Sequence, residues 1–289
     1  MKERNPESES QKESLPNKEI LVPFFGGLTV SGKSGTGKTS AMEILGDLYR
    51  IHPKRMFKGG ETMREKTDVY ARRAKKHDID IDQSQREFIR SADPQNPFID
   101  EGRLAGFLAT QELDKNPNLN VVRILFVASS AVRMNRLFNR RRSHNAKDIN
   151  RLESELEIAY VNNAEPEEVI FLQETLQDLK SKTFTLNSIR GEEVKRETDD
   201  MAQWKRIHPE LQDIDDIFNP SFARVVINPA EINVFNKKGI KFYDFAVNTS
   251  RISVEEAAIE VNLQLKRMEL VEVLKVPDRL PQNELNPEA

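Results

Sequence analysis

Apolar residues in this chain gather in short runs, separated by longer stretches in which they recur at helical spacing. The runs Leu28–Val30, Arg123–Ala128 and Phe242–Val247 are nearly continuous, which is typical of parallel strands buried on both faces. Shorter candidates are Arg55–Lys58 and Pro97–Gly102. Because helical patterns lie between these runs, we expect an α/β fold with a mostly parallel central sheet between two layers of helices.

Two amphipathic helices are predicted beside the sheet. After the first apolar run, Ala41, Met42, Leu45 and Leu48 recur at helical spacing. The last helix is expected to begin at Ser253, where the sequence is typical of a capping box. Its predicted buried face consists of Val254, Ala257, Ala258, Val261, Leu265 and Met268.

A helical excursion is predicted from about Arg133 to Arg206, where charge is dense and glycine is scarce. A break at Asn162–Pro166 divides it, so two helices can pair as a hairpin. Their matching apolar stripes are Leu152, Leu156 and Ala159 before the break and Val169, Leu172, Leu176 and Leu179 after it. The pattern fits both a solvated structural hairpin and a mobile lid over a substrate.

The most informative motif is Gly32–Thr39, a complete G-x-x-x-x-G-K-[ST] loop between an apolar run and a helical pattern. Such a loop directs backbone N–H groups and a helix N-terminus toward nucleotide phosphates. We expect Lys38 to reach the β- and γ-phosphates of ATP and Thr39 to ligate Mg²⁺. The full predicted ATP-binding set is Gly32, Ser34, Gly35, Thr36, Gly37, Lys38, Thr39 and Ser40.

Two further motifs bear on the second substrate. In Gly59–Arg64 an arginine follows a strand end and suits a second phosphate, although an exposed helix arginine explains it equally simply. The second motif is Asp100–Phe107. An ATPase would use Asp100 to bind Mg²⁺ and Glu101 to activate water, whereas a kinase would use Arg103 as a phosphate clamp. A structural salt bridge is the remaining explanation for this motif.

Arginines within the helical excursion supply further positive charge. Arg133, Arg136 and Arg140 share a helix face, and Arg196 lies near the end of the excursion. Arginines on a closing lid stabilise a moving phosphoryl group, but a basic solvated face has the same pattern.

Composition excludes several other classes. The chain has 289 residues, 31% charged residues, a net charge of −3, four histidines and no cysteine. These values exclude disulfides and thiolate zinc sites, and they predict no nucleic-acid partner and no membrane association. The polar N-terminus has no signal-peptide pattern, so we expect a cytoplasmic protein. Residues 1–19 and 276–289 have few apolar residues and are expected to be disordered tails.

Taken in order, the motifs resemble those of the cytidylate kinase family, especially its shorter archaeal-type members. The matching segments are the phosphate loop, Gly60–Arg64, Glu101–Phe107, Arg196–Glu197, Ile214–Asp216 and Asn248–Arg251. The resemblance implies a P-loop nucleoside monophosphate kinase domain over residues 20–275. Within it, residues 58–95 would bind the acceptor, residues 133–206 would form a helical lid or insertion, and residues 218–241 would form a second insertion.

The resemblance further implies transfer of the γ-phosphoryl group of ATP to CMP or dCMP, with Mg²⁺ bridging the phosphates. Residues that match the family's acceptor site are Gly60, Glu61, Arg64, Glu101 and Arg103. Residues that match its catalytic cations are Lys38, Arg103, Arg140 and Arg196.

Four residues depart from the family pattern. Glu61 and Phe107 stand where aspartate and tryptophan are usual, and Met201 and Gln203 stand where basic residues are frequent. These changes keep two alternatives open: a kinase of the same fold for another nucleotide or a small metabolite, and a catalytically quiet nucleotide-binding interaction protein. The oligomeric state is not predicted.

Overall fold

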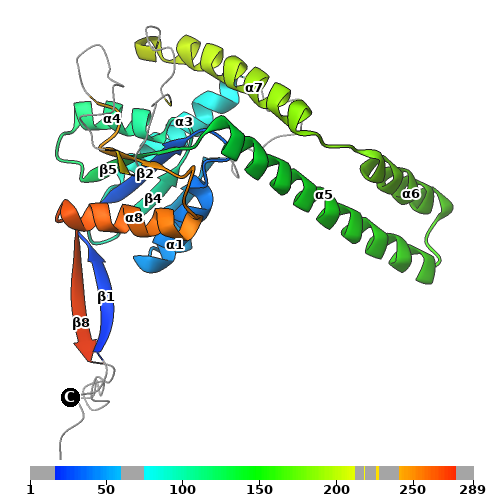
Figure 1. The fold of residues 1–289 in the computed structure, drawn as a ribbon, viewed down its shortest axis with the longest axis horizontal. Coiled ribbons are helices and arrows are strands. Elements are labelled where there is room, and N and C mark those ends of the chain that lie inside the picture. Colours follow the sequence, from blue (N-terminus) through cyan, green and yellow to red (C-terminus); the bar gives the residue numbers. More distant parts are fainter. Residues whose placement is uncertain (1–16, 60–74, 212–217, 219–225, 228–240, 278–289) are drawn as a thin grey trace, which may run out of the picture.

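The computed structural model describes residues 17–59, 75–211, 218, 226–227 and 241–277. Figure 1 shows a sheet flanked by helices, a helical arm and a two-stranded ribbon. The elements are β1 (Asn17–Pro23), β2 (Gly27–Gly32), α1 (Lys38–Leu48), η1 (Pro53–Arg55), β3 (Met56–Lys58), α3 (Lys75–Arg90), β4 (Phe98–Glu101), α4 (Ala105–Lys115), β5 (Val121–Val127), α5 (Ser130–Val161), α6 (Pro166–Ser181), α7 (Leu186–Ile207), η3 (Pro209–Leu211), β6 (Val226–Ile227), β7 (Phe245–Asn248), α8 (Val254–Arg267) and β8 (Val271–Pro277).

The central sheet has the strand order β3-β4-β2-β5-β7-β6. Its first five strands are parallel, and β6 joins the edge antiparallel to β7. The α/β class and the mostly parallel sheet are therefore confirmed. All five predicted strand runs form strands, with shifts of one to three residues at their ends. Of the expected second insertion, residues 219–225 and 228–240 lie outside the described residues.

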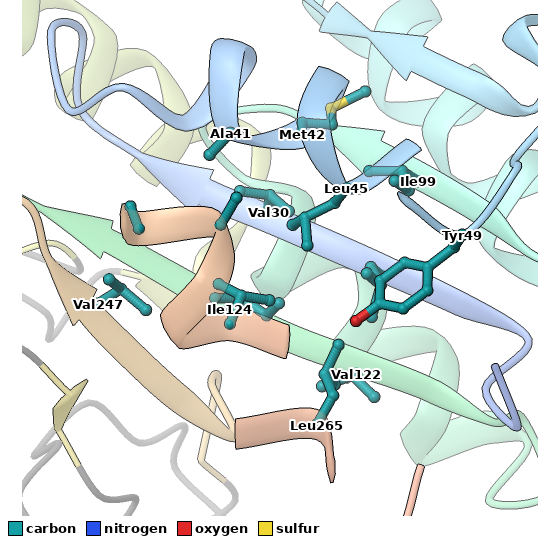
Figure 2. Close-up of a cluster of buried hydrophobic side chains, with 14 of the residues drawn as sticks. Val30, Ala41, Met42, Leu45, Tyr49, Ile99, Val122, Ile124, Val247 and Leu265 are labelled. Atoms are coloured by element: carbon teal, nitrogen blue, oxygen red, sulfur yellow. The ribbon is translucent and has the colours of Figure 1, made fainter. Parts of the chain in front are cut away.

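The core forms two layers because the side chains of each central strand alternate between the faces of the sheet. Val122, Ile124 and Phe126 of β5 pack in one cluster with α1 and α8, as Figure 2 shows for part of that cluster. Val121 and Leu125 pack in the other cluster, with α3 and α4. A strand covered on both faces in this way needs apolar residues at almost every position, which explains the continuous run in the sequence.

A ribbon of β1 and β8 corrects the expectation of terminal tails. The two strands pair antiparallel, from Asn17 opposite Pro277 to Pro23 opposite Val271. Residues 17–19 and 276–277 are thus strand residues, whereas the sequence predicted disorder for them. Residues 17–19 are all polar and residues 276–277 are only two, so neither set gives a local signal for a strand, but backbone hydrogen bonds between β1 and β8 satisfy their peptide groups. The ribbon extends away from the sheet beyond α8 (Figure 1).

The predicted helical excursion consists of α5, α6 and α7. Helix α5 ends at Val161 and α6 begins at Pro166, so the predicted break is confirmed. These two helices form a hairpin that projects from the sheet, and α7 returns over the strand ends (Figure 1). Leu152, Ala159 and Leu176 are buried between elements of the arm, on the predicted stripes. No helix of the described residues is long and apolar enough to cross a membrane.

Two residues at helix ends are more exposed than the apolar patterns predicted. Met268 is 37% exposed and Leu48 is 38% exposed. Met268 is the C-cap of α8 and Leu48 is the last residue of α1, so neither side chain continues the buried helical stripe. The rest of the α8 face is buried at Ala257, Ala258 and Val261.

Candidate active site

The phosphate loop joins the end of β2 to the start of α1, as the motif requires. Gly35 and Gly37 have φ values of 80° and 85°, in the left-handed region that side chains with a Cβ disfavour. A Cβ at Gly35 would lie 2.8 Å from the carbonyl oxygen of Arg133. Gly37 is the N-cap of α1, and no side chain caps this helix. The loop therefore presents an uncapped helix N-terminus, which is a site for anions.

Lys38 and Thr39 both contact Glu101 at the start of α1. Glu101 ends β4, which is paired in register with β2 so that Glu101 lies opposite Val30. Its Oε1 is 3.1 Å from Lys38 Nζ, and its Oε2 accepts a hydrogen bond of 3.2 Å from Thr39 Oγ1. All three groups thus meet where two parallel strands end. Sequence reasoning assigned Glu101 to the acceptor, whereas in the structure it contacts the lysine and threonine assigned to ATP.

Asp100, the other acid of the pair, points away from the phosphate loop. Its Oδ1 accepts a 2.8 Å hydrogen bond from Gln85 Nε2. Complete burial raises the pKa of Asp100 to about 8, and the adjacent Glu101 acts in the same direction. Asp100 does not line the cavity, and Glu101 is the acid beside Thr39. This arrangement disfavours the ATPase interpretation, in which Asp100 would bind Mg²⁺.

Arg103 reaches the phosphate loop from the turn after β4. Its Nη2 donates a 2.9 Å hydrogen bond to Ser34 Oγ, and its Nη1 contacts the carboxylate of Asp200. The guanidinium also lies 6.0 Å from the centre of the Trp204 ring. Burial lowers the pKa of Arg103, and the positive charge of Arg196 acts in the same direction. A desolvated guanidinium beside the loop is suited to binding a phosphate bidentately.

Two arginines of α5 hold the loop by its backbone. Arg133 Nε donates to the carbonyl oxygen of Ser34 at 2.9 Å. Arg136 donates to Thr249 Oγ1 and to the Thr249 carbonyl oxygen, each at 2.8 Å. Thr249 Oγ1 in turn donates to the carbonyl oxygen of Thr36 at 2.7 Å. The predicted basic face is therefore not simply solvated, because two of its arginines are structural supports of the loop.

The other two predicted catalytic arginines, Arg140 and Arg196, line the same cavity as the loop. Arg196 is about half exposed and lies 3.4 Å from Glu193 and 3.8 Å from Asp200, both on its own helix. Sequence reasoning identified Arg196 as a candidate but did not identify the carboxylates of Glu193 and Asp200 beside it. These carboxylates are three and four residues from Arg196 in the sequence, a spacing that predicts contact along a helix.

The loop opens into a cavity of about 1160 Å³ at the carboxyl ends of the strands. Its lining includes Ser34, Gly35, Gly37, Lys38, Thr39 and Ser40. Gly32 and Thr36, the other predicted ATP contacts, do not line it. Thr36 is 1% exposed, and its hydroxyl donates to the carbonyl oxygen of Lys33, within the loop. Thr36 therefore shapes the loop.

Several predicted acceptor residues cannot be placed. Gly60, Glu61 and Arg64 lie outside the described residues, as does Ile214–Asp216. Phe107 is described, but it packs against His208 and Phe242 in the core and does not line the cavity. The structure therefore places Phe107 in the core and not at the site.

The oxygen donors at the loop fit magnesium. Thr39 Oγ1 and the Glu101 carboxylate are hard oxygen ligands placed together at the helix N-terminus. Within the described ranges no three or more His, Cys, Asp or Glu residues cluster as a metal site. A metal held by two protein oxygens and by phosphate oxygens matches the usual mode of Mg²⁺ in nucleotide sites.

No protein-family model matches this chain, and no curated protein matches it. Solved structures similar to it include an uncharacterized protein from Eubacterium ventriosum, with 14% identity, 83% of this chain and 98% of that chain covered, and a TM-score of 0.43. A provisionally named kinase from Chloroflexus aurantiacus has 18% identity, 42% and 70% coverage, and a TM-score of 0.33. A gluconokinase from Sinorhizobium meliloti has 16% identity, 67% and 99% coverage, and a TM-score of 0.30. Likenesses this distant leave the function to be argued from the site itself.

Proposed function

We propose that this protein is a kinase that transfers the γ-phosphoryl group of ATP to CMP or dCMP, giving ADP and the nucleoside diphosphate. The observation that carries the proposal is the meeting of Lys38, Thr39 and Glu101 beside Arg103 in one cavity. The first three groups suit a donor triphosphate, and the buried arginine suits a second phosphate. The cavity also exceeds the roughly 300–1,000 Å³ of a typical single-ligand site, which fits two nucleotides.

On the donor side, the uncapped N-terminus of α1 and the ammonium of Lys38 bind the phosphates. Thr39 and Glu101 would hold Mg²⁺, which neutralises charge on the phosphate oxygens when bound. The hydrogen bonds from Arg133 and Arg136 keep the loop in its binding conformation, so little conformational entropy is lost when a nucleotide binds.

On the acceptor side, Arg103 holds the monophosphate, together with Arg64 if the resemblance extends to that segment. An oxygen of the acceptor phosphate attacks the γ-phosphorus, and the bond from that phosphorus to the β–γ bridging oxygen breaks, with the electron pair leaving on ADP. The acceptor phosphate is already ionised at neutral pH, so no protein base is required. Positioning and charge stabilisation supply the catalysis.

Arg140 and Arg196 are placed to act on the transferred group, because both line the cavity from the helical excursion. Rearrangement of that excursion around the bound substrates would bring these cations to the phosphoryl group and expel water. This role treats the excursion as a lid.

The test is ADP release from ATP and Mg²⁺ with a panel of acceptors: CMP, dCMP, UMP, AMP, GMP and a set of sugars and polyols. CMP or dCMP should stimulate ADP release most strongly, and Lys38→Ala should lower kcat by about 10²–10³-fold. Stimulation by no monophosphate would refute the nucleoside monophosphate kinase. Tight ATP binding without transfer to any acceptor would instead favour the quiet interaction protein.

A second candidate is a kinase for a hydroxyl-bearing small metabolite. The observation that favours it is a carboxylate–histidine pair: Asp82 lines the cavity, and its Oδ2 lies 2.7 Å from His208 Nε2. A hydroxyl acceptor must lose a proton as it attacks, and a carboxylate paired with histidine suits that task. Stimulation by a polyol and not by monophosphates would select this candidate.

A further inference from the structure

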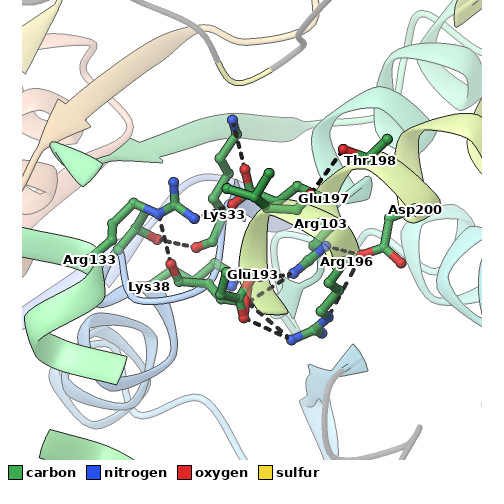
Figure 3. Close-up of polar contacts among 12 residues, drawn as sticks. Lys33, Lys38, Arg103, Arg133, Glu193, Arg196, Glu197, Thr198 and Asp200 are labelled. Atoms are coloured by element: carbon green, nitrogen blue, oxygen red, sulfur yellow. Dashed lines mark hydrogen bonds and ion pairs between the residues drawn. The ribbon is translucent and has the colours of Figure 1, made fainter. Parts of the chain in front are cut away.

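The face of α7 that lies over the phosphate loop carries three carboxylates. Glu193, Glu197 and Asp200 recur at intervals of four and three residues, so they share one side of the helix. Figure 3 shows them directed toward cations from three other parts of the chain. Each of the three makes ion pairs with groups that line or support the phosphate loop.

Glu197 binds the loop itself. Its Oε2 lies 3.3 Å from Lys33 Nζ, and its Oε1 contacts Arg133 Nη2. Lys33 is a residue of the loop, and Arg133 holds the carbonyl oxygen of Ser34. One carboxylate of α7 therefore pairs with two cations at the rim of the anion site.

Asp200 and Glu193 bind the arginines assigned to phosphate. Asp200 contacts Arg103 and lies 3.8 Å from Arg196, and Glu193 lies 3.7 Å from Arg103 and 3.4 Å from Arg196. Arg103 donates at the same time to Ser34 Oγ. A guanidinium fork binds carboxylate and phosphate oxygens with the same donor groups, so a phosphate must compete with these carboxylates.

The remainder of α7 is held by apolar contacts near its two ends. Ile189 packs with Met134 and Leu137 of α5, and Trp204 packs in the cluster of α4. The stretch between them faces the loop through ion pairs. Another anion can replace the carboxylate of an exposed ion pair at a small cost in free energy, whereas breaking buried apolar contacts costs more. Anions can therefore displace the middle of α7 without unfolding its ends.

We propose that the carboxylates of Glu193, Glu197 and Asp200 substitute for phosphate at the cations of the loop, and that a nucleotide must displace them to bind. The helix is thus an autoinhibitory contact that lowers nucleotide affinity and moves when phosphates arrive. This inference rests on the proposed function only in requiring that the loop binds nucleotide phosphates. It does not depend on the acceptor or on catalysis.

The experiment compares Glu197→Gln with Glu192→Gln by calorimetric titration of the full chain with Mg²⁺ and ADP. Glu192 lies on the same helix, and its carboxylate pairs with Arg141, away from the loop. Glu197→Gln should lower the dissociation constant of ADP by about fivefold, the effect of removing one competing ion pair. Glu192→Gln should leave it unchanged. Asp200→Asn is a second variant with the same expected direction, should Glu197→Gln fail to fold.

A second readout reports the exchange of the α7 carboxylates for phosphate. Trp204 is the single tryptophan of the chain, it is 9% exposed, and it lies on α7 beside Arg103. Addition of Mg²⁺ and ADP, or of inorganic pyrophosphate alone, should change the intensity of its fluorescence, because the Arg103 guanidinium beside the ring then exchanges the Asp200 carboxylate for a phosphate. Pyrophosphate has no base or sugar, so it tests the phosphate competition directly.

The outcomes separate the two proposals. If the native chain binds ADP but Glu197→Gln and Asp200→Asn bind it no more tightly, the autoinhibitory contact is refuted and the proposed function stands. If Glu192→Gln bound ADP more tightly by the same factor, the autoinhibitory contact would also be refuted, because the effect would then come from net charge alone. If the native chain and every variant fail to bind ADP and pyrophosphate, the proposed function fails and this inference fails with it. Binding by the variants alone supports the contact.

Discussion

Lys38 Nζ lies 3.1 Å from Glu101 Oε1, where β2 and β4 end side by side, and both side chains are almost fully buried. The same carboxylate accepts a hydrogen bond from Thr39. Glu101 thus connects a lysine suited to phosphate with a hydroxyl suited to Mg²⁺. The predictions below follow from this contact and from the groups around it.

Glu101→Gln should raise the magnesium concentration that activity requires. The amide keeps the shape of the side chain but is a poorer ligand than a carboxylate for a hard cation, so the Mg²⁺ concentration for half-maximal activity should rise about tenfold. Steady-state rates across a magnesium titration measure this. Glu112→Gln, on α4 outside the cavity lining, is the control, and an equal shift in the two variants would contradict a metal role for Glu101.

Arg103→Lys should raise the KM for the acceptor by about tenfold, because lysine keeps the charge but loses the guanidinium fork. Arg123→Lys is the matched control. Arg123 makes an ion pair with Asp244 and does not line the cavity, so its replacement should lower stability and leave the acceptor KM unchanged. Acceptor titrations at saturating ATP separate the two. An unchanged KM in Arg103→Lys would place the acceptor phosphate elsewhere.

Two glycine-to-alanine substitutions should have opposite effects. Gly35 has φ 80°, and a Cβ there would lie 2.8 Å from a backbone oxygen, so Gly35→Ala should destabilise the loop by about 1–3 kcal/mol and abolish ADP binding. Gly191 is inside α7, and a Cβ there would meet nothing within 4 Å. Gly191→Ala should stabilise the protein by about 0.5–1 kcal/mol. Urea unfolding and ADP titration of both variants test this; a loop that tolerates alanine at position 35 would contradict the assigned strain.

Stability should fall at acid pH partly through Glu112. Although burial opposes it, hydrogen bonds from Arg90, Lys115 and Arg86 lower the pKa of Glu112 from 4.5 to about 2. The unfolded chain binds the proton more readily, so this stabilisation is present above pH 4.5 and is lost as the pH falls from about 4.5 to 2. In Glu112→Gln the free energy of unfolding should depend less steeply on pH in that window.

The control for this pH effect is Glu210→Gln, a change at a side chain that accepts an exposed hydrogen bond from Gln111. Denaturant unfolding at several pH values between 2.5 and 6 gives both slopes. If Glu112→Gln and the native chain had the same slope, the ion-pair cluster around Glu112 would not carry the acid sensitivity.

Local sequence determined the phosphate loop, the parallel strands and the helices of the arm. Each depends on interactions between residues close in sequence. These are the glycine conformations in the loop, the continuous apolar runs of buried strands, and the helical spacing on either side of the break before Pro166. These features appear within a window of ten to twenty residues. They were therefore visible without knowledge of the fold, as were Lys38, Thr39 and Arg103.

Tertiary structure alone decided which of these groups meet. The pairing of β1 with β8 joins segments at opposite ends of the chain, and the sequence of neither segment shows which distant strand supplies its backbone partner. The position of Glu101 beside Lys38 follows from the register of β4 on β2. The carboxylates of α7 reach the loop only because the arm folds back over the strand ends. Such contacts depend on packing between distant segments. A local sequence pattern does not indicate which distant charged residue will lie opposite a given side chain.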